Sequence, residues 1–295
     1  MSSVHLVVVH RNRGTTCRDT VHRFLQQTEF LDFPTLTVTV VDNGSTPEHL
    51  AGLRDGLAPG VEVIENGKNL GFGPGANVGL KHWLESGSQD NSSEFCLLAP
   101  HDARPADQTV EHLIRGLAAH PEAGLACADV GDGQVPRIDP WLGPVSEPQP
   151  KGGESPGWVL ADYPHGTLMA LRRNCLTQIG IFDERYFAYC EEADLGIRAR
   201  NAGWTIGLVC GALVDNPESN TDAAVIDYLM VRNTLLLLRV HYGLANLWFR
   251  IGVLAAEHVI GWWRPTVRSP YHSGRARFRA SIDAVSGRFG PPTFH

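Results

Sequence analysis

Short apolar runs separated by amphipathic segments occupy the first two-thirds of the chain. A continuous apolar run bounded by turn residues is typical of a strand that is buried on both faces. The runs predicted as strands are Val4–Val9, Leu36–Val41, Val61–Ile64, Phe95–Ala99, Leu168–Leu171 and Thr205–Val209. Because helical segments alternate with them, we expect an α/β fold whose mostly parallel sheet has helices on both faces.

Polar and glycine-rich residues gather where these strands end. They are found at His10–Gly14, Asp42–Ser45, Gly67–Asn77 and His101–Asp102. Ligands of open α/β sheets bind beyond the carboxyl ends of the strands. The sequence therefore predicts a ligand site at this edge.

The segment from Phe182 to Trp204 predicts an aromatic loop followed by a helix with Glu191, Glu192 and Asp194 in its first turn. The apolar positions at helical spacing are Leu195, Ala199 and Ala202. Glu192 projects over the same inward face, and Asp194 is spaced to pair with Arg198. An inward carboxylate is a candidate general base. The alternative is that these acids only complement the helix dipole.

Downstream, the pattern changes twice. Gly131–Gly157 holds six Pro and six Gly, which indicates an irregular loop, either a mobile lid or a plain linker. Asp222–His241 then predicts a helix with one apolar face. The residues expected on that face are Tyr228, Val231, Leu235 and Leu238.

Charge is divided unevenly along the chain. The net charge is −7, yet the part from Thr221 onward has nine Arg, no Lys and four acids, so it carries +5 and the remainder −12. An acidic body argues against general nucleic-acid binding, whereas the basic tail allows contact with an anionic surface.

Cysteine usage and hydropathy limit the remaining classes. The six Cys show neither C-x-x-C nor zinc spacing, and Cys96 and Cys127 sit in apolar runs typical of a core. With a strand starting almost at once and no signal peptide, we expect a reduced cytoplasmic protein. Leu244–Trp263 is the most apolar stretch, but its charged residues favour an interfacial or packed helix over a membrane span.

Several motifs in this order and spacing resemble the family-two glycosyltransferases of the GT-A fold, and most closely the bacterial rhamnosyltransferase-like branch that builds cell-surface polysaccharides. The matching pieces are Val-Val-Asp-Asn-Gly-Ser (40–45), Asn-Leu-Gly-Phe-Gly-x-Gly-Ala-Asn (69–77), the Asp102 turn, Gly-Thr-Leu-Met-Ala-Leu-Arg-Arg (166–173), Gly-x-Phe-Asp-Glu-Arg-Tyr-Phe-x-Tyr-x-Glu-Glu-x-Asp-Leu (180–195) and Arg-Asn (232–233). The resemblance implies a nucleotide-sugar-binding catalytic domain over residues 1–220 and a C-terminal helical segment over 221–295.

For the donor site, the resemblance implies that Asp42 contacts a pyrimidine base, since a carboxylate accepts the ring N–H of uracil or thymine. The alternative is that Asp42 caps its own turn. The glycines near 71–75 permit close backbone approach to phosphate at a helix N-terminus. The residues expected to bind the nucleotide are His10, Arg11, Asn12, Asp42, Asn43, Ser45, Asn69, Gly71, Phe72, Gly73, Ala76 and Asn77.

A divalent cation, Mg²⁺ or Mn²⁺, is implied at Asp102, which takes the place of the last carboxylate of the family's Asp-x-Asp motif. His101 and Asp215 are further candidate ligands. The chain departs from the family twice: Pro100 replaces the first carboxylate, and Asp215-Asn216 stands where many relatives have a His. Metal-independent transfer therefore stays open.

For catalysis, the resemblance implies an inverting transfer with Glu192 as base, and with Glu191 and Asp194 positioning either Glu192 or the acceptor. Tyr186, Phe187 and Tyr189 either stack on sugars or pack in the core. The residues expected on the acceptor side are Gly166, Thr167, Tyr189 and Arg232.

The expected donor is dTDP-rhamnose first and a UDP-sugar next, and the acceptor a glycan or lipid-linked saccharide. The apolar C-terminal helix implies peripheral contact with the inner face of the membrane, a homodimer contact, or packing on the catalytic domain. A non-catalytic nucleotide-sugar-binding module is the rival function. A Rossmann dehydrogenase is excluded because Arg11–Gly14 does not supply Gly-x-Gly-x-x-Gly after the first strand.

Overall fold

The computed structural model describes residues 3–27, 35–86, 94–150, 157–215, 221–264, 266 and 269–292, apart from the side chain of Trp262. The strands are β1 (Val4–His10), β2 (Leu36–Asp42), β3 (Glu62–Glu65), β4 (Phe95–Pro100), β5 (Arg104–Pro105), β6 (Ala123–Asp129), β7 (Gln134–Asp139), β8 (Gly143–Pro148), β9 (Gly157–Leu160), β10 (Met169–Arg172) and β11 (Thr205–Asp215). The helices are α1 (Gly14–Gln26), α2 (Pro47–Arg54), α3 (Phe72–Ser86), α4 (Thr109–Ala119), α5 (Arg173–Ile179), α6 (Glu191–Asn201), α7 (Ala223–His241), α8 (Leu244–Trp263) and α9 (Gly274–Val285).

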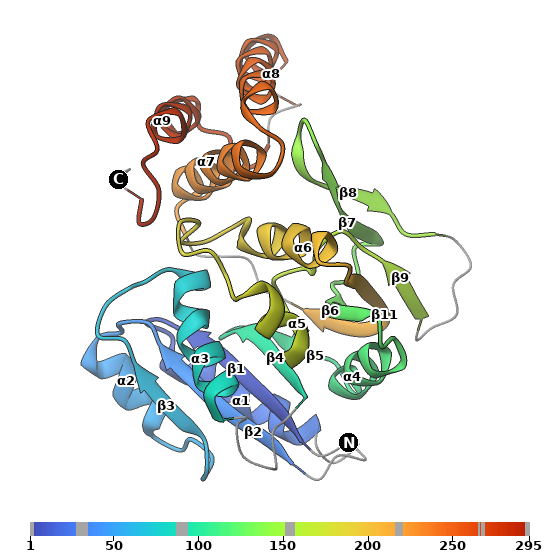
Figure 1. Cartoon of the computed structure of the whole chain (residues 1–295). Coiled ribbons are helices and arrows are strands. Elements are labelled where there is room, and N and C mark those ends of the chain that lie inside the picture. The colour runs from blue at the N-terminus through green and yellow to red at the C-terminus, as the bar shows by residue number, and fades with distance from the viewer. Residues whose placement is uncertain are drawn as a thin grey trace.

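One large sheet organises the molecule, with strand order β3-β2-β1-β4-β10-β6-β11-β5 and β9 paired to β11 (Figure 1). Strands β3, β2, β1 and β4 are mutually parallel, and β6 is parallel to β11. Strand β10 runs antiparallel between β4 and β6. The predicted mostly parallel sheet is confirmed, and the reversal at β10 brings the segment before it to the edge where the parallel strands end.

Both faces of the sheet are covered, as expected from strands that are apolar on both sides. Apolar side chains of α1, α2 and α4 fill one face, and those of α3, α5 and α6 fill the other. Cys96 and Cys127 are fully buried among them, as predicted.

The prediction that Gly131–Gly157 is an irregular loop, as a lid or a linker, is wrong for most of the segment, which forms a two-stranded ribbon. Strands β7 and β8 form an antiparallel hairpin from Gln134 opposite Pro148 to Asp139 opposite Gly143. Prolines are tolerated because each strand of a two-stranded ribbon has an unpaired edge. Residues 151–156 of this segment lie outside the described part.

Three helices form a separate layer at the end of the molecule farthest from β1–β3 (Figure 1). Helices α7, α8 and α9 share an apolar cluster, and α7 also packs on α6. The face predicted for α7 is buried at all four positions. In the described residues, no helix combines the length and apolarity needed to cross a membrane. The domain boundary at residue 220 stays a prediction.

Candidate active site

Five strands bring their polar ends to one edge of the sheet. The parallel strands β1, β2 and β4 end there at His10, Asp42 and Pro100. Met169, the first residue of β10, lies opposite Leu98, so Gly166 and Thr167 just before it reach the same edge. Strand β6 is antiparallel to β10 and ends there as well. The predicted ligand edge is therefore assembled from segments far apart in sequence.

The ends of β1 and β2 form a compact polar cluster around His10 and Asp42. His10 Nε2 lies 3.0 Å from Asp42 Oδ1 and 3.2 Å from Ser45 Oγ. Ser45 Oγ accepts a hydrogen bond of 2.8 Å from the backbone N–H of Asn12, and the Ser45 N–H donates to Asp42 Oδ2 over 3.1 Å. Asp42 thus caps its own turn, as one interpretation held. Its contact with a base stays a prediction.

Burial favours the neutral form of two histidines at this edge, His10 and His101. It lowers the pKa of His10 to about 4, against the opposing effect of Asp42. It also lowers the pKa of His101, whose ring lies 6.3 Å from that of His10. Near neutral pH the cluster therefore presents imidazole rings without added positive charge, whereas Arg11 is exposed beside it.

Asn43 holds the glycine-rich loop in shape. Its amide donates to the carbonyl of Gly71 over 2.7 Å, and its Oδ1 accepts from the backbone N–H of Leu70 over 3.1 Å. It also contacts the side chains of Asn66 and Asn69. Because Asn43 is 3% exposed and bonded on both sides, it shapes the loop from below. The contact of Asn43 with a nucleotide stays a prediction.

The start of α3 packs directly on the loop that precedes the acidic helix α6. The N–H of Gly73 donates to the carbonyl of Phe187 over 3.3 Å. Asn77 is 1% exposed, and its amide donates to the carbonyl of Phe182 and accepts from its N–H. Ala76 is also fully buried. The side chains of Ala76 and Asn77 therefore join the two loops rather than line an open site.

Gly71→Ala is expected to lower the free energy of unfolding by about 2–4 kcal/mol. Gly71 has φ +93°, and a Cβ there would lie 2.2 Å from the Phe187 carbonyl oxygen. Gly67→Ala is the matched control, because Gly67 also has positive φ, +65°, with nothing within 4 Å of its Cβ position. It should cost about 1–2 kcal/mol. Equal losses in urea unfolding would show that the close approach to Phe187 is unimportant.

The loop before α6 has an unusual backbone that α7 holds in place. Phe187, Tyr189 and Cys190 have φ values of 65°, 70° and 69°. The amide of Asn233 donates to the carbonyls of Tyr186, Ala188 and Tyr189, over 2.7, 2.7 and 2.8 Å. A loop in the left-handed region persists only when its surroundings fix it. Asn233 provides that support.

Glu192 is the carboxylate that meets the sheet edge. Its Oε1 lies 3.5 Å from the position that a Cβ on Gly166 would occupy. Its Oε2 is buried and has no hydrogen-bond partner among the described residues. Burial raises the pKa of Glu192 to about 7. A carboxylate that only complemented a helix dipole would be solvated, so this environment favours the base interpretation.

The two neighbouring acids differ from Glu192. Glu191 is 3% exposed under Gly73, and burial together with the Glu192 charge raises its pKa well above the usual range. Asp194 is 2% exposed and binds Arg198 Nε and His241 Nε2, each at 2.8 Å. The predicted Asp194–Arg198 pair is confirmed. Asp194 fastens α6 to α7, so its place is in the scaffold of the site.

The apolar side of α6 follows the prediction except at its end. Leu195 and Ala199 are fully buried, whereas Ala202 is half-buried. The helix ends at Asn201, so Ala202 caps it and does not extend its inward face. Tyr186 and Phe187 are buried in the core, which favours the packing interpretation over sugar stacking, and Tyr189 is half-buried.

The candidate metal ligands only partly converge. Asp102 has a side chain that is 25% exposed, with His101 Nε2 4.0 Å from its Oδ2. Asp215 is 73% exposed and faces Arg104 at 3.8 Å. Within the described ranges, no three His, Cys, Asp or Glu side chains form a metal cluster, and Asn216 lies outside those ranges. Mg²⁺ accepts one or two carboxylates completed by substrate phosphates. Asp102 fits that donor set, whereas Asp215 is paired with Arg104.

On the acceptor side, the structure separates the four predicted residues. Gly166 lies against Glu192, and Thr167 next to it is 3% exposed with its Oγ1 3.0 Å from His165 Nδ1. Arg232 is 1% exposed and bonds to Asn233 Oδ1 over 3.1 Å. Arg232 therefore has no surface for an acceptor contact and stabilises the α6 loop from within.

Two residues at the site were not singled out from sequence. Asp129 ends β6 at the same edge, is 7% exposed, and accepts from the N–H of Gly131 over 2.8 Å. Its place directly after an apolar run was a usable signal. Asn233 was noticed only as part of a motif, and no local pattern reveals the three carbonyls that it binds.

Known proteins resemble this chain in sequence and in fold. The family described as "Glycosyl transferase family 2" matches residues 5–179. An N-acetylglucosaminyl-diphospho-decaprenol L-rhamnosyltransferase of Mycobacterium tuberculosis is 24% identical, covering 84% of this chain and 83% of that protein. The low-salt glycan biosynthesis hexosyltransferase Agl10 of Haloferax volcanii is 27% identical, covering 67% of this chain and 65% of that protein.

Two solved structures have the same fold. GalNAc-T7 with UDP, GalNAc and Mn²⁺ has a TM-score of 0.64 at 14% identity, covering 96% of this chain and 54% of that one. The mannosyltransferase PcManGT from Pyrobaculum calidifontis, with GDP-Man and Mn²⁺, has a TM-score of 0.60 at 14% identity, covering 97% and 86%. With a GT-A fold and a family match over more than half of its length, the chain belongs to glycosyltransferase family 2 and is a glycosyltransferase.

Proposed function

We propose that this enzyme transfers a sugar, with inversion, from a pyrimidine nucleoside diphosphate donor to a hydroxyl of a glycan or lipid-linked saccharide. The donor is dTDP-rhamnose first and a UDP-sugar next. The observation that carries the proposal is the partly desolvated Glu192 carboxylate against Gly166, at the edge where His10, Asp42 and Asp102 also lie. The rhamnosyl relative, whose name gives a decaprenol-linked substrate, supports this choice of sugar and acceptor.

In the reaction, Glu192 removes the proton of the acceptor hydroxyl as its oxygen bonds to the anomeric carbon. The bond from that carbon to the donor diphosphate breaks, and the nucleoside diphosphate leaves with the electron pair. The exposed Arg11 stabilises the departing charge. A divalent cation held by Asp102 would supply further neutralisation of the diphosphate. The single displacement inverts the anomeric centre, so no nucleophilic carboxylate is required.

Thermal unfolding with a panel of nucleotides tests the donor class. We expect dTDP and UDP to raise Tm more than ADP or GDP, with a larger shift when Mn²⁺ is present. A ligand at a hundred times its Kd adds about 2.7 kcal/mol of stability. Asp42→Asn should weaken the dTDP shift, whereas Asp55→Asn, at an exposed position after α2, should not. Equal shifts for purine nucleotides would contradict the proposed base preference.

A non-catalytic nucleotide-sugar-binding module is the second candidate. Its support is the incomplete metal-ligand set around Asp102. Such a module would give the same nucleotide-dependent Tm shifts but no transfer. Turnover of the Glu192 variant, described in the Discussion, separates the two.

A further inference from the structure

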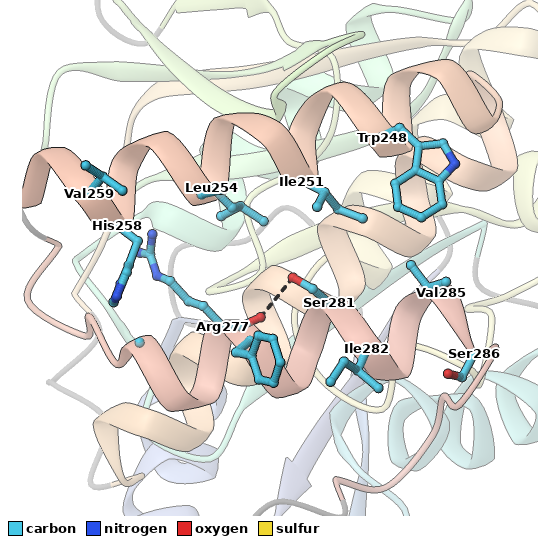
Figure 2. A pocket seen from close by; sticks show the side chains of 13 residues that line it. Trp248, Ile251, Leu254, His258, Val259, Arg277, Ser281, Ile282, Val285 and Ser286 are labelled. Carbon is cyan, nitrogen blue, oxygen red and sulfur yellow. Dashed lines mark hydrogen bonds between the residues drawn. The ribbon is translucent and has the colours of Figure 1, made fainter.

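An open apolar groove lies between α8 and α9, on the helical layer away from the sheet (Figure 2). It encloses about 700 Å³. Trp248, Ile251 and Leu254 of α8 and Ile282 and Val285 of α9 line it. Large apolar surfaces of this kind on a folded protein mark contact sites for another apolar body.

The apolar surface continues beyond the groove. Trp263 is 78% exposed, Phe278 70% and Val259 55%. Along α8, the exposed residues Leu244, Trp248, Val259 and Trp263 recur at helical spacing, so they form one outward stripe. A stripe of this composition matches the interfacial helices that lie in the plane of a bilayer surface.

Basic residues lie where α8 ends and α9 begins. Arg264 directly follows α8 and Arg275 lies in the first turn of α9, and both are exposed. The part of the chain from Thr221 carries +5, against −12 for the rest. An anionic surface would therefore attract this end and repel the catalytic body, which orients the molecule.

The acids of this part are already engaged, which argues against a second copy as the occupant. Asp227 and Glu257 bind Arg277, at 2.9 Å each. Asp283 binds Arg279 at 3.0 Å, and Asp222 accepts from a backbone N–H at the start of α7. A two-fold contact through this face would bring two sets of arginines together without spare carboxylates.

We propose that the α8–α9 face docks on an anionic lipid bilayer, with its aromatic and aliphatic side chains among the acyl chains and its arginines at the phosphates. The docking proposal rests on the proposed function in that the lipid-linked acceptor is presented at such a bilayer surface. Helix α7 joins the two places, since it packs on α8 and α9 and supports the loop before α6.

Co-sedimentation of the full chain with vesicles tests the docking surface. We expect binding to phosphatidylcholine vesicles that contain phosphatidylglycerol, weakening with salt, and little binding to phosphatidylcholine alone. Trp263→Asp with Phe278→Asp should reduce binding at least about ten-fold. Arg264→Glu should reduce it about ten-fold, whereas Arg23→Glu, the same charge change at an exposed position of α1, should leave it unchanged.

Transfer to a water-soluble acceptor, measured in parallel, separates the two proposals. The surface variants should keep wild-type transfer, because the substituted residues are exposed and lie in or next to α8 and α9, which carry none of the candidate catalytic residues. Vesicle binding without transfer by the wild type overturns the proposed function and leaves the docking surface standing. Transfer by the wild type without vesicle binding overturns the docking surface and leaves the proposed function standing. A wild-type dimer that the Trp263 and Phe278 substitutions convert to monomer, without vesicle binding, makes the face a self-interface and overturns lipid docking.

Discussion

Glu192→Gln is expected to lower turnover by about 10²- to 10⁴-fold, while the nucleotide-dependent rise in Tm stays close to wild type. The amide has nearly the shape of the carboxylate but cannot take the acceptor proton. Because Glu192 is the only described acid set against Gly166, no neighbouring acid replaces it. Single-turnover transfer from the donor and dTDP-induced Tm shifts are the two measurements.

The pH profile gives a second readout of the same residue. Burial raises the pKa of Glu192 from 4.5 to about 7, so wild-type kcat/KM should rise as pH increases through 7. The residual activity of Glu192→Gln should lack that rise. In stability, a raised carboxyl pKa means that the favourable contribution is present below pH 4.5 and is lost as pH rises through 7. The Tm advantage of Glu192→Gln over wild type should therefore grow between mildly acidic and alkaline pH.

Glu184→Gln is the matched control. It makes the same change from carboxylate to amide, but at an exposed residue of the loop before α6. Its turnover should stay within about two-fold of wild type. Unchanged turnover in Glu192→Gln would reject the base role. No detectable turnover in the wild type with any pyrimidine nucleotide sugar, despite nucleotide binding, would favour the non-catalytic module.

Asn233→Ala is expected to lower the free energy of unfolding by about 2–4 kcal/mol and to lose most turnover even where the protein is folded. The substitution removes the side-chain donor of the Ala188 and Tyr189 carbonyls, one of the donors of the Tyr186 carbonyl, and the acceptor of Arg232 Nε. The left-handed loop then loses the support that sets the start of α6, and Glu192 with it. Urea unfolding and turnover per folded molecule are the measurements.

Asn246→Ala provides the comparison. Asn246 is 9% exposed and its amide donates to one carbonyl, that of Pro140, over 2.8 Å. Its loss should cost about 1 kcal/mol and leave turnover per folded molecule intact. Equal effects of the two substitutions on turnover would remove Asn233 from the positioning of Glu192.

The sequence by itself determined the periodic parts of this protein. The six predicted strand runs and the predicted buried face of α7 are correct. Residues on a buried face of a strand or helix recur with the period of that element, so the spacing of apolar residues along the chain reveals them. The polar strand ends were predicted to meet because parallel strands finish at a common edge. The Asp194–Arg198 pair followed from helical spacing alone.

Only the tertiary structure decided the contacts that polar side chains make with residues far away in sequence. The proline-rich segment pairs as β7–β8, Arg232 is buried as a support, and Asn233 reaches three carbonyls more than forty residues away in sequence. The raised pKa of Glu192 likewise depends on burial by distant elements and on its place against Gly166. Such contacts join segments that are far apart in sequence. Local sequence patterns do not reveal them, because the burial and the hydrogen-bond partners of these side chains are fixed only when the segments pack together.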